Sequence, residues 1–283
     1  MRKIEYRKRV YNVKMLVSGL AVFFIINFTS TAFAKYITIN TSVSTTVTGS
    51  EATLDIKLKN LGDDPAFGLS VKVLSKPGIA VSSKIPTLEP GAEKMLTLKT
   101  AIETDLLQQI VPLMIYYKDG KGHPFSVLSY AIARSDGAEP SRVSAKIEPI
   151  ELSRKRAVVV KAKSIDGKSR HVDIRMLTPD ELTVTPKNIE LDIPGAEEVD
   201  ALFELSNLNA TSDSTYLILG IVSEKRKKGL FEEITLGKVT TITSKSIIEI
   251  LTGRPALWVL GLLAFGYIMY EIIHRRQHHR NLN

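Results

Sequence analysis

The 283-residue chain contains no cysteine and only one tryptophan. Without cysteine it can have no disulfide framework, no thiol nucleophile and no thiolate ligand for a metal ion. Packing and hydrogen bonding alone must therefore hold the folded part together. The scarcity of tryptophan also argues against a glycan-binding face, because such faces stack sugars on aromatic rings.

The sequence also lacks the common catalytic motifs. It has no G-x-S-x-G, no H-E-x-x-H and no G-x-x-x-x-G-K-[ST], which mark serine hydrolases, zinc proteases and nucleotide-binding loops. His123 and His171 are the two histidines between the chain ends, and they fall in different predicted domains. We therefore expect no enzyme, no bound cofactor and no small-molecule substrate.

Positive charge gathers at the two ends of the chain. Of 38 basic and 30 acidic residues, ten basic and two acidic ones lie in residues 1–34 and 253–283, which leaves 28 of each between them. The net charge of +8 therefore comes from the ends. Nucleic-acid binding is not expected, since it depends on basic patches on a folded domain.

One long apolar run, residues 255–273, lies near the C-terminus, and Glu271 is its only charged residue. As a helix it would reach roughly 28 Å, which matches the hydrocarbon core of a bilayer. We predict a transmembrane helix, with a buried core helix as the alternative. The residues expected to anchor it are interfacial aromatics and the arginines that follow: Trp258, Tyr267, Tyr270, Arg275 and Arg276.

The N-terminus has the layout of a secretory signal peptide. Residues 1–34 combine a basic start, an apolar stretch and the small-residue pattern Ala32-Phe33-Ala34. An uncleaved N-terminal anchor is the alternative. Export followed by a membrane stop places the intervening residues in a periplasmic or extracellular location. The basic tail, residues 274–283, stays in the cytoplasm, as the positive-inside rule requires.

The first predicted domain, residues 35–135, alternates apolar and polar side chains. Leu54, Ile56 and Leu58, for example, share one face of a predicted strand. Turn residues recur at intervals of about eight to twelve positions, which is typical of antiparallel sheets. This pattern predicts a seven-stranded immunoglobulin-like sandwich.

The second predicted domain, residues 143–245, follows a polar linker at residues 136–142. We predict another seven-stranded immunoglobulin-like sandwich, with residues 143–152 as its first strand and the almost entirely apolar residues 216–222 as a central one. A stalk at residues 246–254 leads to the predicted span. The fold class is thus all-β, with two tandem sandwiches between a signal peptide and one C-terminal transmembrane helix.

Turn motifs mark the first domain at three places: Asn60-Leu61-Gly62, Leu88-Glu89-Pro90-Gly91 and Tyr116-Tyr117-x-Asp119-x-x-Gly122. With them the domain resembles the CARDB-type immunoglobulin-like modules of bacteria and archaea. The second domain keeps the strand plan but lacks the third motif. The resemblance implies a membrane-anchored protein with tandem modules that binds or scaffolds, without naming a ligand.

Three aspartates are weak candidates for a calcium site. Asp63 and Asp64 follow the second predicted strand and Asp119 lies in the last hairpin turn, and these loops share one end of such a sandwich. Ordinary turn aspartates are the alternative. We expect this loop end to form the tip farthest from the membrane.

Two basic loops occur in the second domain. Arg154, Lys155 and Arg156 are expected to face the membrane, because the last strand of the domain must end there. Contact with anionic lipid is the hypothesis, and a solvated turn is the alternative. The other loop, residues 225–228, is expected to point toward the domain junction, where it either meets acidic residues of the linker or stays exposed.

Together these features predict a non-catalytic protein that a single helix anchors in the cytoplasmic membrane. It is expected to bind a protein partner in the bacterial envelope, as an accessory subunit or an adhesion module. One alternative is a membrane-tethered assembly chaperone for exported subunits, which requires an open, apolar sheet edge. Another is a glycan-binding accessory module.

Overall fold

The computed structural model describes residues 36–75, 80–103, 106–135, 138–227 and 229–242, together with residues 261, 266–267 and 269–270. Most of the predicted membrane features lie outside these residues: the signal peptide, Trp258, Arg275, Arg276 and the basic tail. Tyr267 and Tyr270 are described as helical, with exposed side chains. None of the helical residues described belongs to a helix long and apolar enough to cross a membrane.

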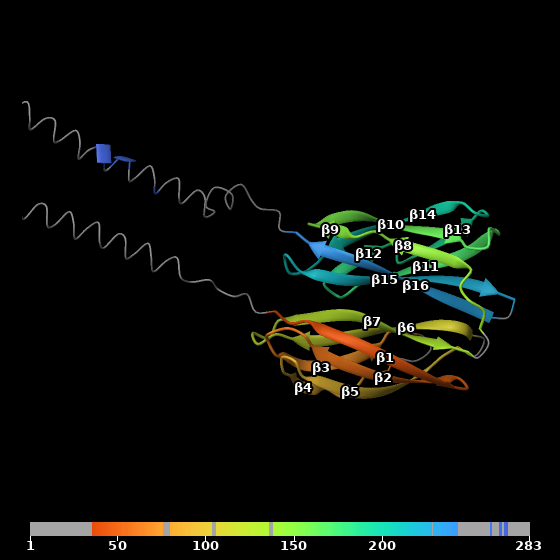
Figure 1. Ribbon diagram of the computed structural model, residues 1–283, viewed down its shortest axis with the longest axis horizontal. Helices are drawn as coiled ribbons and strands as arrows, with labels where there is room; N and C mark the ends of the chain where they lie inside the picture. Colours follow the sequence, from red (N-terminus) through yellow and green to blue (C-terminus); the bar gives the residue numbers. More distant parts are fainter. Residues whose placement is uncertain are drawn as a thin grey trace, which may run out of the picture.

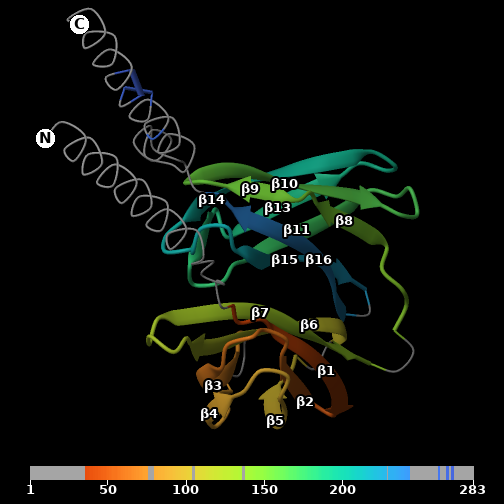
Figure 2. The ribbon, with the colours of Figure 1, turned by 60° about the vertical axis from the view of Figure 1, so that its left-hand side comes forward.

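The folded part is all-β, as the alternating sequence predicts. Its strands are β1 (Ile39–Thr48), β2 (Glu51–Asn60), β3 (Ala66–Val73), β4 (Ile85–Leu88), β5 (Glu93–Ala101), β6 (Leu106–Lys118), β7 (Pro124–Arg134), β8 (Val143–Ile147), β9 (Ile150–Leu152), β10 (Lys155–Ser164), β11 (Arg170–Leu177), β12 (Leu182–Thr185), β13 (Asn188–Ile193), β14 (Glu198–Asn207), β15 (Thr215–Arg226) and β16 (Gly229–Thr241). They form two sandwiches, which Figures 1 and 2 show from two directions.

The first sandwich packs the sheet β1-β2-β5 against strands in the order β7-β6-β3-β4. The inward row of β2, which includes Leu54, Ile56 and Leu58, is fully buried, as the alternation predicts. Between β3 and β4, Val81 makes only a single bridge, to Lys72. The count of seven strands is nevertheless as predicted for this half.

The second sandwich packs β12-β14-β10-β8 against β13-β11-β15-β16. The single strand predicted at residues 143–152 is divided into β8, which pairs with β10, and β9, which pairs with β16 in the opposite sheet. Pro149 lies between them and has no amide hydrogen to donate, so the ladder is interrupted there. This half of the described chain therefore has nine strands instead of seven.

The two sandwiches lie side by side and share a sheet. Near Leu230 and Phe231, β16 pairs in parallel with β6 at Leu106 and Gln108, which joins strands of both halves into one nine-stranded sheet. In Figure 1, β15 and β16 face β6 and β7 across the junction. The sequence did not predict this arrangement, because it treated the halves as separate domains joined by a linker.

A small apolar core fills the junction. Met114 of β6, Leu128 of β7 and Leu219 of β15 are buried there. Tyr116 and Leu217 are among the partly buried side chains that pack around them. Since these residues lie on the outer faces of the two sandwiches, their burial depends on contact between the halves.

The side chain of Asn60 joins two of the turn motifs. It is fully buried. Its Nδ2 donates to the carbonyls of Asp64 and Leu88 at 2.8 and 3.1 Å, and its Oδ1 accepts from the Gly62 amide at 2.9 Å. Buried polar groups need such partners. The amide thus ties the loop after β2 to the turn after β4.

Candidate binding site

A groove lies between the two sandwiches, at the end away from the β6–β16 contact. Its volume is about 860 Å³. The first sandwich contributes residues 36–39, Tyr117 and Phe125, and the second contributes Tyr216 and Lys238. We call this the interdomain groove. Because β6 and β16 pair only near residue 230, the outer faces of the sheets are free to separate toward the other end.

Beside the groove, Glu181 of the second half binds Ser126 of the first. Its two carboxylate oxygens accept hydrogen bonds from the Ser126 amide and hydroxyl, both at 2.6 Å. The Asp180 amide in turn donates to Ser126 Oγ at 2.8 Å. Both Glu181 and Ser126 are buried, so this contact fixes the groove wall without offering a free reactive group.

Aromatic side chains give the groove an apolar lining. Tyr117 and Phe125 stack with their ring centroids 5.5 Å apart. Burial raises the pKa of the Tyr117 phenol, and the nearby Glu181 adds to the rise. Tyr216 accepts a hydrogen bond from the Thr211 amide at 3.0 Å. These phenols stay neutral at physiological pH, so the groove combines apolar rings with neutral polar atoms.

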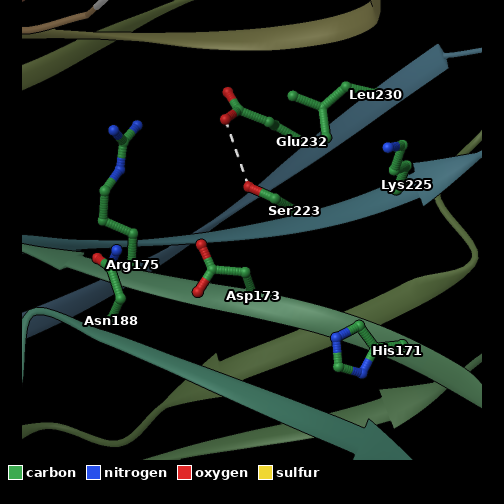
Figure 3. A pocket seen from close by; sticks show the side chains of 8 residues that line it. All are labelled: His171, Asp173, Arg175, Asn188, Ser223, Lys225, Leu230 and Glu232. Carbon is green, nitrogen blue, oxygen red and sulfur yellow. Dashed lines mark hydrogen bonds between the residues drawn. The ribbon is translucent and has the colours of Figure 1, made fainter.

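A second cavity, of about 350 Å³, opens on the outer face of β11, β13, β15 and β16. Figure 3 shows its side chains: His171, Asp173, Arg175, Asn188, Ser223, Lys225, Leu230 and Glu232. We call it the polar cleft. Burial and the neighbouring Glu190 raise the pKa of Asp173, while a 2.7 Å contact with Asp192 raises the pKa of His171.

Glu232 connects the polar cleft to the domain junction. Its carboxylate accepts from the Ile110 amide at 2.8 Å and from Ser223 Oγ at 3.3 Å. Its carbonyl accepts from the side chain of Gln108 at 2.8 Å. Burial raises the pKa of Glu232 although the Ile110 amide opposes the rise. A single residue of β16 thus holds two positions of β6.

This buried carboxyl should make stability depend on pH. Because its pKa is raised on folding, Glu232 contributes most stability below the unfolded pKa of about 4.3. That contribution is lost as the pH rises toward and past its folded pKa. We expect Glu232→Gln, which cannot ionise, to be more stable than wild type by about 1 kcal/mol at pH 8. Urea denaturation at pH 4 and pH 8 measures the difference.

The matched control is Glu197→Gln, since Glu197 is exposed. This variant should follow the wild type at both pH values. The explanation would be contradicted if Glu232→Gln and wild type differed in free energy of unfolding by the same amount at pH 4 and at pH 8. The free-energy cost of ionising a buried carboxyl must grow as the pH rises.

Two of the three candidate aspartates accept hydrogen bonds from backbone amides. Asp63 accepts from the Tyr36 amide at 2.7 Å, and Asp119 accepts from the amides of Lys121 and His123, each at 2.9 Å. Across the described residues, no three acidic or histidine side chains gather as a metal site would require. The structure therefore does not bring the aspartates together as calcium ligands.

The loops that carry these aspartates lie at the end of the molecule where β16 finishes. Asp64 and Asp119 line the interdomain groove together with Asp213. The Asp213 amide donates to the carbonyl of Thr241 at the end of β16, at 2.9 Å. In Figure 1, β1 begins and β16 ends at the same end of the molecule. The aspartates thus lie beside the exit of the chain, because the sandwiches are side by side and not end to end.

The basic loop at residues 154–156 lies close to the end of β16. The Ile242 amide donates to the carbonyl of Leu152 at 2.9 Å, so the loop adjoins the end of β16. Lys155 pairs with Glu204 at 2.8 Å, and Arg156 donates to the Glu151 carbonyl at 3.1 Å. Contact of Arg154, Lys155 and Arg156 with lipid stays a prediction.

The other basic loop does meet the linker. Arg226 donates to the carbonyl of Pro140 at 3.2 Å. It also pairs with Glu224 at 2.7 Å and lies over the Phe231 ring at 4.1 Å. The acidic linker residue Glu139 pairs with Arg142 instead. Stacking and pairing of a buried arginine at this hairpin support the junction.

Comparison with known proteins gives only distant likenesses. No protein-family model and no curated protein matches the chain. Trypsin-activated alpha-2-macroglobulin from Escherichia coli matches at 10% identity and a TM-score of 0.31, over 73% of this chain and 18% of that one. A protein of unknown function from Porphyromonas gingivalis W83 matches at 13% identity and a TM-score of 0.27, over 71% of this chain and 99% of that one.

The chain thus spans about a fifth of the macroglobulin chain that it matches. Likenesses at this identity and TM-score assign no function, so the function must be argued from the chain's own residues.

Sequence reasoning missed the groups that join the halves: Gln108, Ser126, Glu181 and Glu232. One signal was available. Both β6 and β15 are apolar on two faces, which is unusual for antiparallel strands with one solvated face. The apolar outer faces indicate that something covers them. Nothing local marks Glu181 or Ser126 as partners.

Proposed function

We propose that this chain is a non-catalytic, single-pass membrane protein whose two immunoglobulin-like sandwiches bind a protein partner outside the cytoplasm. It acts as an accessory subunit of a bacterial envelope complex or as an adhesion module. The signal peptide and C-terminal span argued from the sequence give it a periplasmic or extracellular location with a cytoplasmic tail.

One observation carries the binding role: the sandwiches are joined into one body that leaves a groove of about 860 Å³ open between them. The body is held by the β6–β16 pairing, the apolar junction and the Glu181–Ser126 contact. A large, mostly apolar concavity between domains is where ligands and partners usually bind. Catalytic geometry does not accompany it in the described residues.

The family proposal is supported by the turn motifs. Asn60, Gly62 and Leu88, which carry the likeness to CARDB-type modules, make direct hydrogen bonds to one another's loops. The Asp119 turn of the third motif accepts two backbone amides. Such bonds give these residues a structural reason to recur in a shared turn motif.

The test is affinity purification of the intact protein from its own membranes in mild detergent. We expect a stoichiometric envelope protein to co-purify and to remain bound through gel filtration. Isolation of the chain alone, at full yield and under gentle extraction, would refute the binding role.

The membrane-facing loop gives a separate prediction. Replacing Arg154, Lys155 and Arg156 by glutamine should weaken binding of the fragment 36–242 to anionic liposomes by at least about tenfold, because basic residues near anionic headgroups favour binding. Sedimentation with phosphatidylserine-containing vesicles measures the effect.

The control replaces an equal number of basic residues at the opposite end of the second sandwich, namely Lys168, Lys225 and Lys227. This variant should bind the vesicles like the unmodified fragment. Equal loss in both variants would mean that net charge, and not the loop, determines binding.

A further inference from the structure

A hydroxyl at the floor of the interdomain groove has no partner. Tyr117 of β6 lines the groove, and only 8% of its surface is exposed. Its neighbours Glu181 and Tyr216, both of the second sandwich, act electrostatically on the phenol, so the hydroxyl points from the first sandwich toward the second. Across the described residues, nothing donates a hydrogen bond to this oxygen or accepts one from it.

The other polar groups nearby are satisfied within the fold. The Tyr216 hydroxyl accepts from the Thr211 amide at 3.0 Å, and both carboxylate oxygens of Glu181 accept from Ser126. Buried polar groups normally have such partners, and a phenol can both donate and accept. An unpaired hydroxyl this deep between two domains therefore indicates a position for a polar group of a bound molecule.

The charged side chains around the groove are mainly acidic. Three aspartates and two lysines line it: Asp64, Asp119, Asp213, Lys121 and Lys238. A fourth carboxylate, that of the buried Glu181, adjoins the floor. The contact with His123 lowers the pKa of Asp119, which keeps this carboxylate ionised at physiological pH. The excess of negative charge attracts a cationic group and repels an anionic one.

The walls of the groove suit the stem of a long side chain. Tyr117 and Phe125 stack with their ring centroids 5.5 Å apart, and Ile37 and Val127 also line the groove. Lysine and arginine lay their methylene stems along apolar surface and keep the charged head group at polar atoms. An apolar wall beside an unpaired hydroxyl and several carboxylates matches that division of the side chain.

We propose that the interdomain groove binds a lysine or arginine side chain from an extended segment of the protein partner. The cationic group donates to Tyr117 Oη, its stem lies along the Tyr117 and Phe125 rings, and the aspartates that line the groove stabilise its charge. This inference rests on the proposed function and names the chemistry of the contact. With about 860 Å³, the groove has the volume of a ligand-sized cleft and admits this side chain with adjoining backbone.

The charge of the groove argues against two other occupants. An acidic segment would bring its carboxylate beside those of Glu181 and the three aspartates, and like charges at such distances repel. A bare metal ion would lack ligands, since no three acidic or histidine side chains gather in the part of the chain that the structure describes.

The absence of cysteine makes the site directly testable by cross-linking. Thr215→Cys places a thiol at an exposed position that lines the groove. The intact variant is labelled with a benzophenone maleimide in native membranes, irradiated and purified. We expect a cross-link to the partner, within a segment that contains a lysine or arginine. A cross-linked segment without either residue would overturn the proposal.

The matched control is Thr46→Cys, which is also an exposed threonine. It lies on β1 seven positions beyond Ile39, a residue of the groove, and therefore roughly 23 Å further along the strand. No cross-link to the partner is expected from position 46.

The cross-linked segment is then synthesised in two forms, one with its basic residue and one with norleucine, which keeps an apolar stem and lacks the charge. Fluorescence anisotropy measures the binding of each peptide to the intact protein in mild detergent. We expect wild type to bind the charged peptide at least tenfold more tightly than the norleucine peptide, because hydrogen bonds to charged groups are the stronger ones.

Tyr117→Phe removes only the unpaired hydroxyl, so its melting temperature should match that of wild type. It should bind the charged peptide at least tenfold more weakly than wild type does, and the norleucine peptide equally, because that contact is already absent. Tyr130→Phe is the control, since Tyr130 packs in the apolar junction and does not line the groove. It should bind both peptides like wild type.

The outcomes separate the two proposals. A cross-link from position 46 and none from position 215 overturns the groove site and leaves the binding role intact. Equal affinity of wild type for the two peptides, or unchanged affinity of Tyr117→Phe for the charged one, overturns the cationic contact. A cross-link from position 215 to a glycan, or to this chain itself, overturns the choice of occupant. Failure of any protein to co-purify with wild type overturns the binding role and, with it, this inference.

Discussion

Replacing Gly62 by alanine is expected to destabilise the first sandwich by about 3 kcal/mol. A Cβ atom at this position would lie 2.3 Å from the carbonyl oxygen of Tyr36, 2.8 Å from Ile37 Cα and 2.9 Å from the Thr38 amide nitrogen. All three are backbone atoms, which cannot turn aside as a flexible side chain can. The urea midpoint, followed by far-ultraviolet circular dichroism, measures the loss.

The close approach at Gly62 is part of the structure's bonding. The neighbouring Leu61 amide donates to the Thr38 carbonyl at 2.7 Å, and the Asp63 amide donates to the Tyr36 carbonyl at 3.0 Å. Moving the segment before β1 to admit a methyl group would break these bonds. Overpacking against backbone should therefore reach the upper part of the usual range of about 1–3 kcal/mol.

Gly120→Ala is the matched control. A Cβ atom there would meet only Phe67 Cε2, at 3.8 Å, so its midpoint should stay close to that of wild type. If both variants unfold at the same urea concentration, the packing of Gly62 against residues 36–38 does not contribute to stability.

Replacing Leu219 by arginine is expected to separate the two sandwiches. Leu219 is fully buried, with Met114 and Leu128, in the apolar junction. An unpaired guanidinium there would cost about 3 kcal/mol or more. Because the side chain lies outside the two sandwich cores, each half should remain folded. We therefore expect unchanged circular dichroism, a larger radius of gyration in X-ray scattering, and faster proteolysis of the linker.

The control lies directly across the ladder. Leu236 is paired with Leu219 in the register of β15 and β16 but is 43% exposed. Leu236→Arg should leave the radius of gyration and the proteolysis rate unchanged. A compact Leu219→Arg protein would show that the junction is held by the β6–β16 pairing and the Glu181–Ser126 contact without its apolar core.

Alternation in the sequence predicted most strands because it records which side chains face the core. Leu54, Ile56 and Leu58, which were predicted to share one face of a strand, are all buried in β2. The error arose where the chain changes sheet, at Pro149, which divides the strand predicted at residues 143–152. At such places the partner strand, and not the local pattern, decides the structure.

The candidate site was less accessible to sequence reasoning. The apolar outer faces of β6 and β15 indicated a covered surface, yet their sequence could not name the covering strand. Gln108 and Glu232, which meet at the junction, are 124 positions apart.

The sequence by itself determined a cysteine-free, all-β middle with alternating strands, since local periodicity reports burial of one face. It determined the tight turns as well, because glycine and asparagine meet local backbone needs. Only the tertiary structure decided that the sandwiches lie side by side, that β6 and β16 join them, and that a groove results. Those features depend on pairings between distant segments, whose free energies reflect shape and register that no local pattern contains.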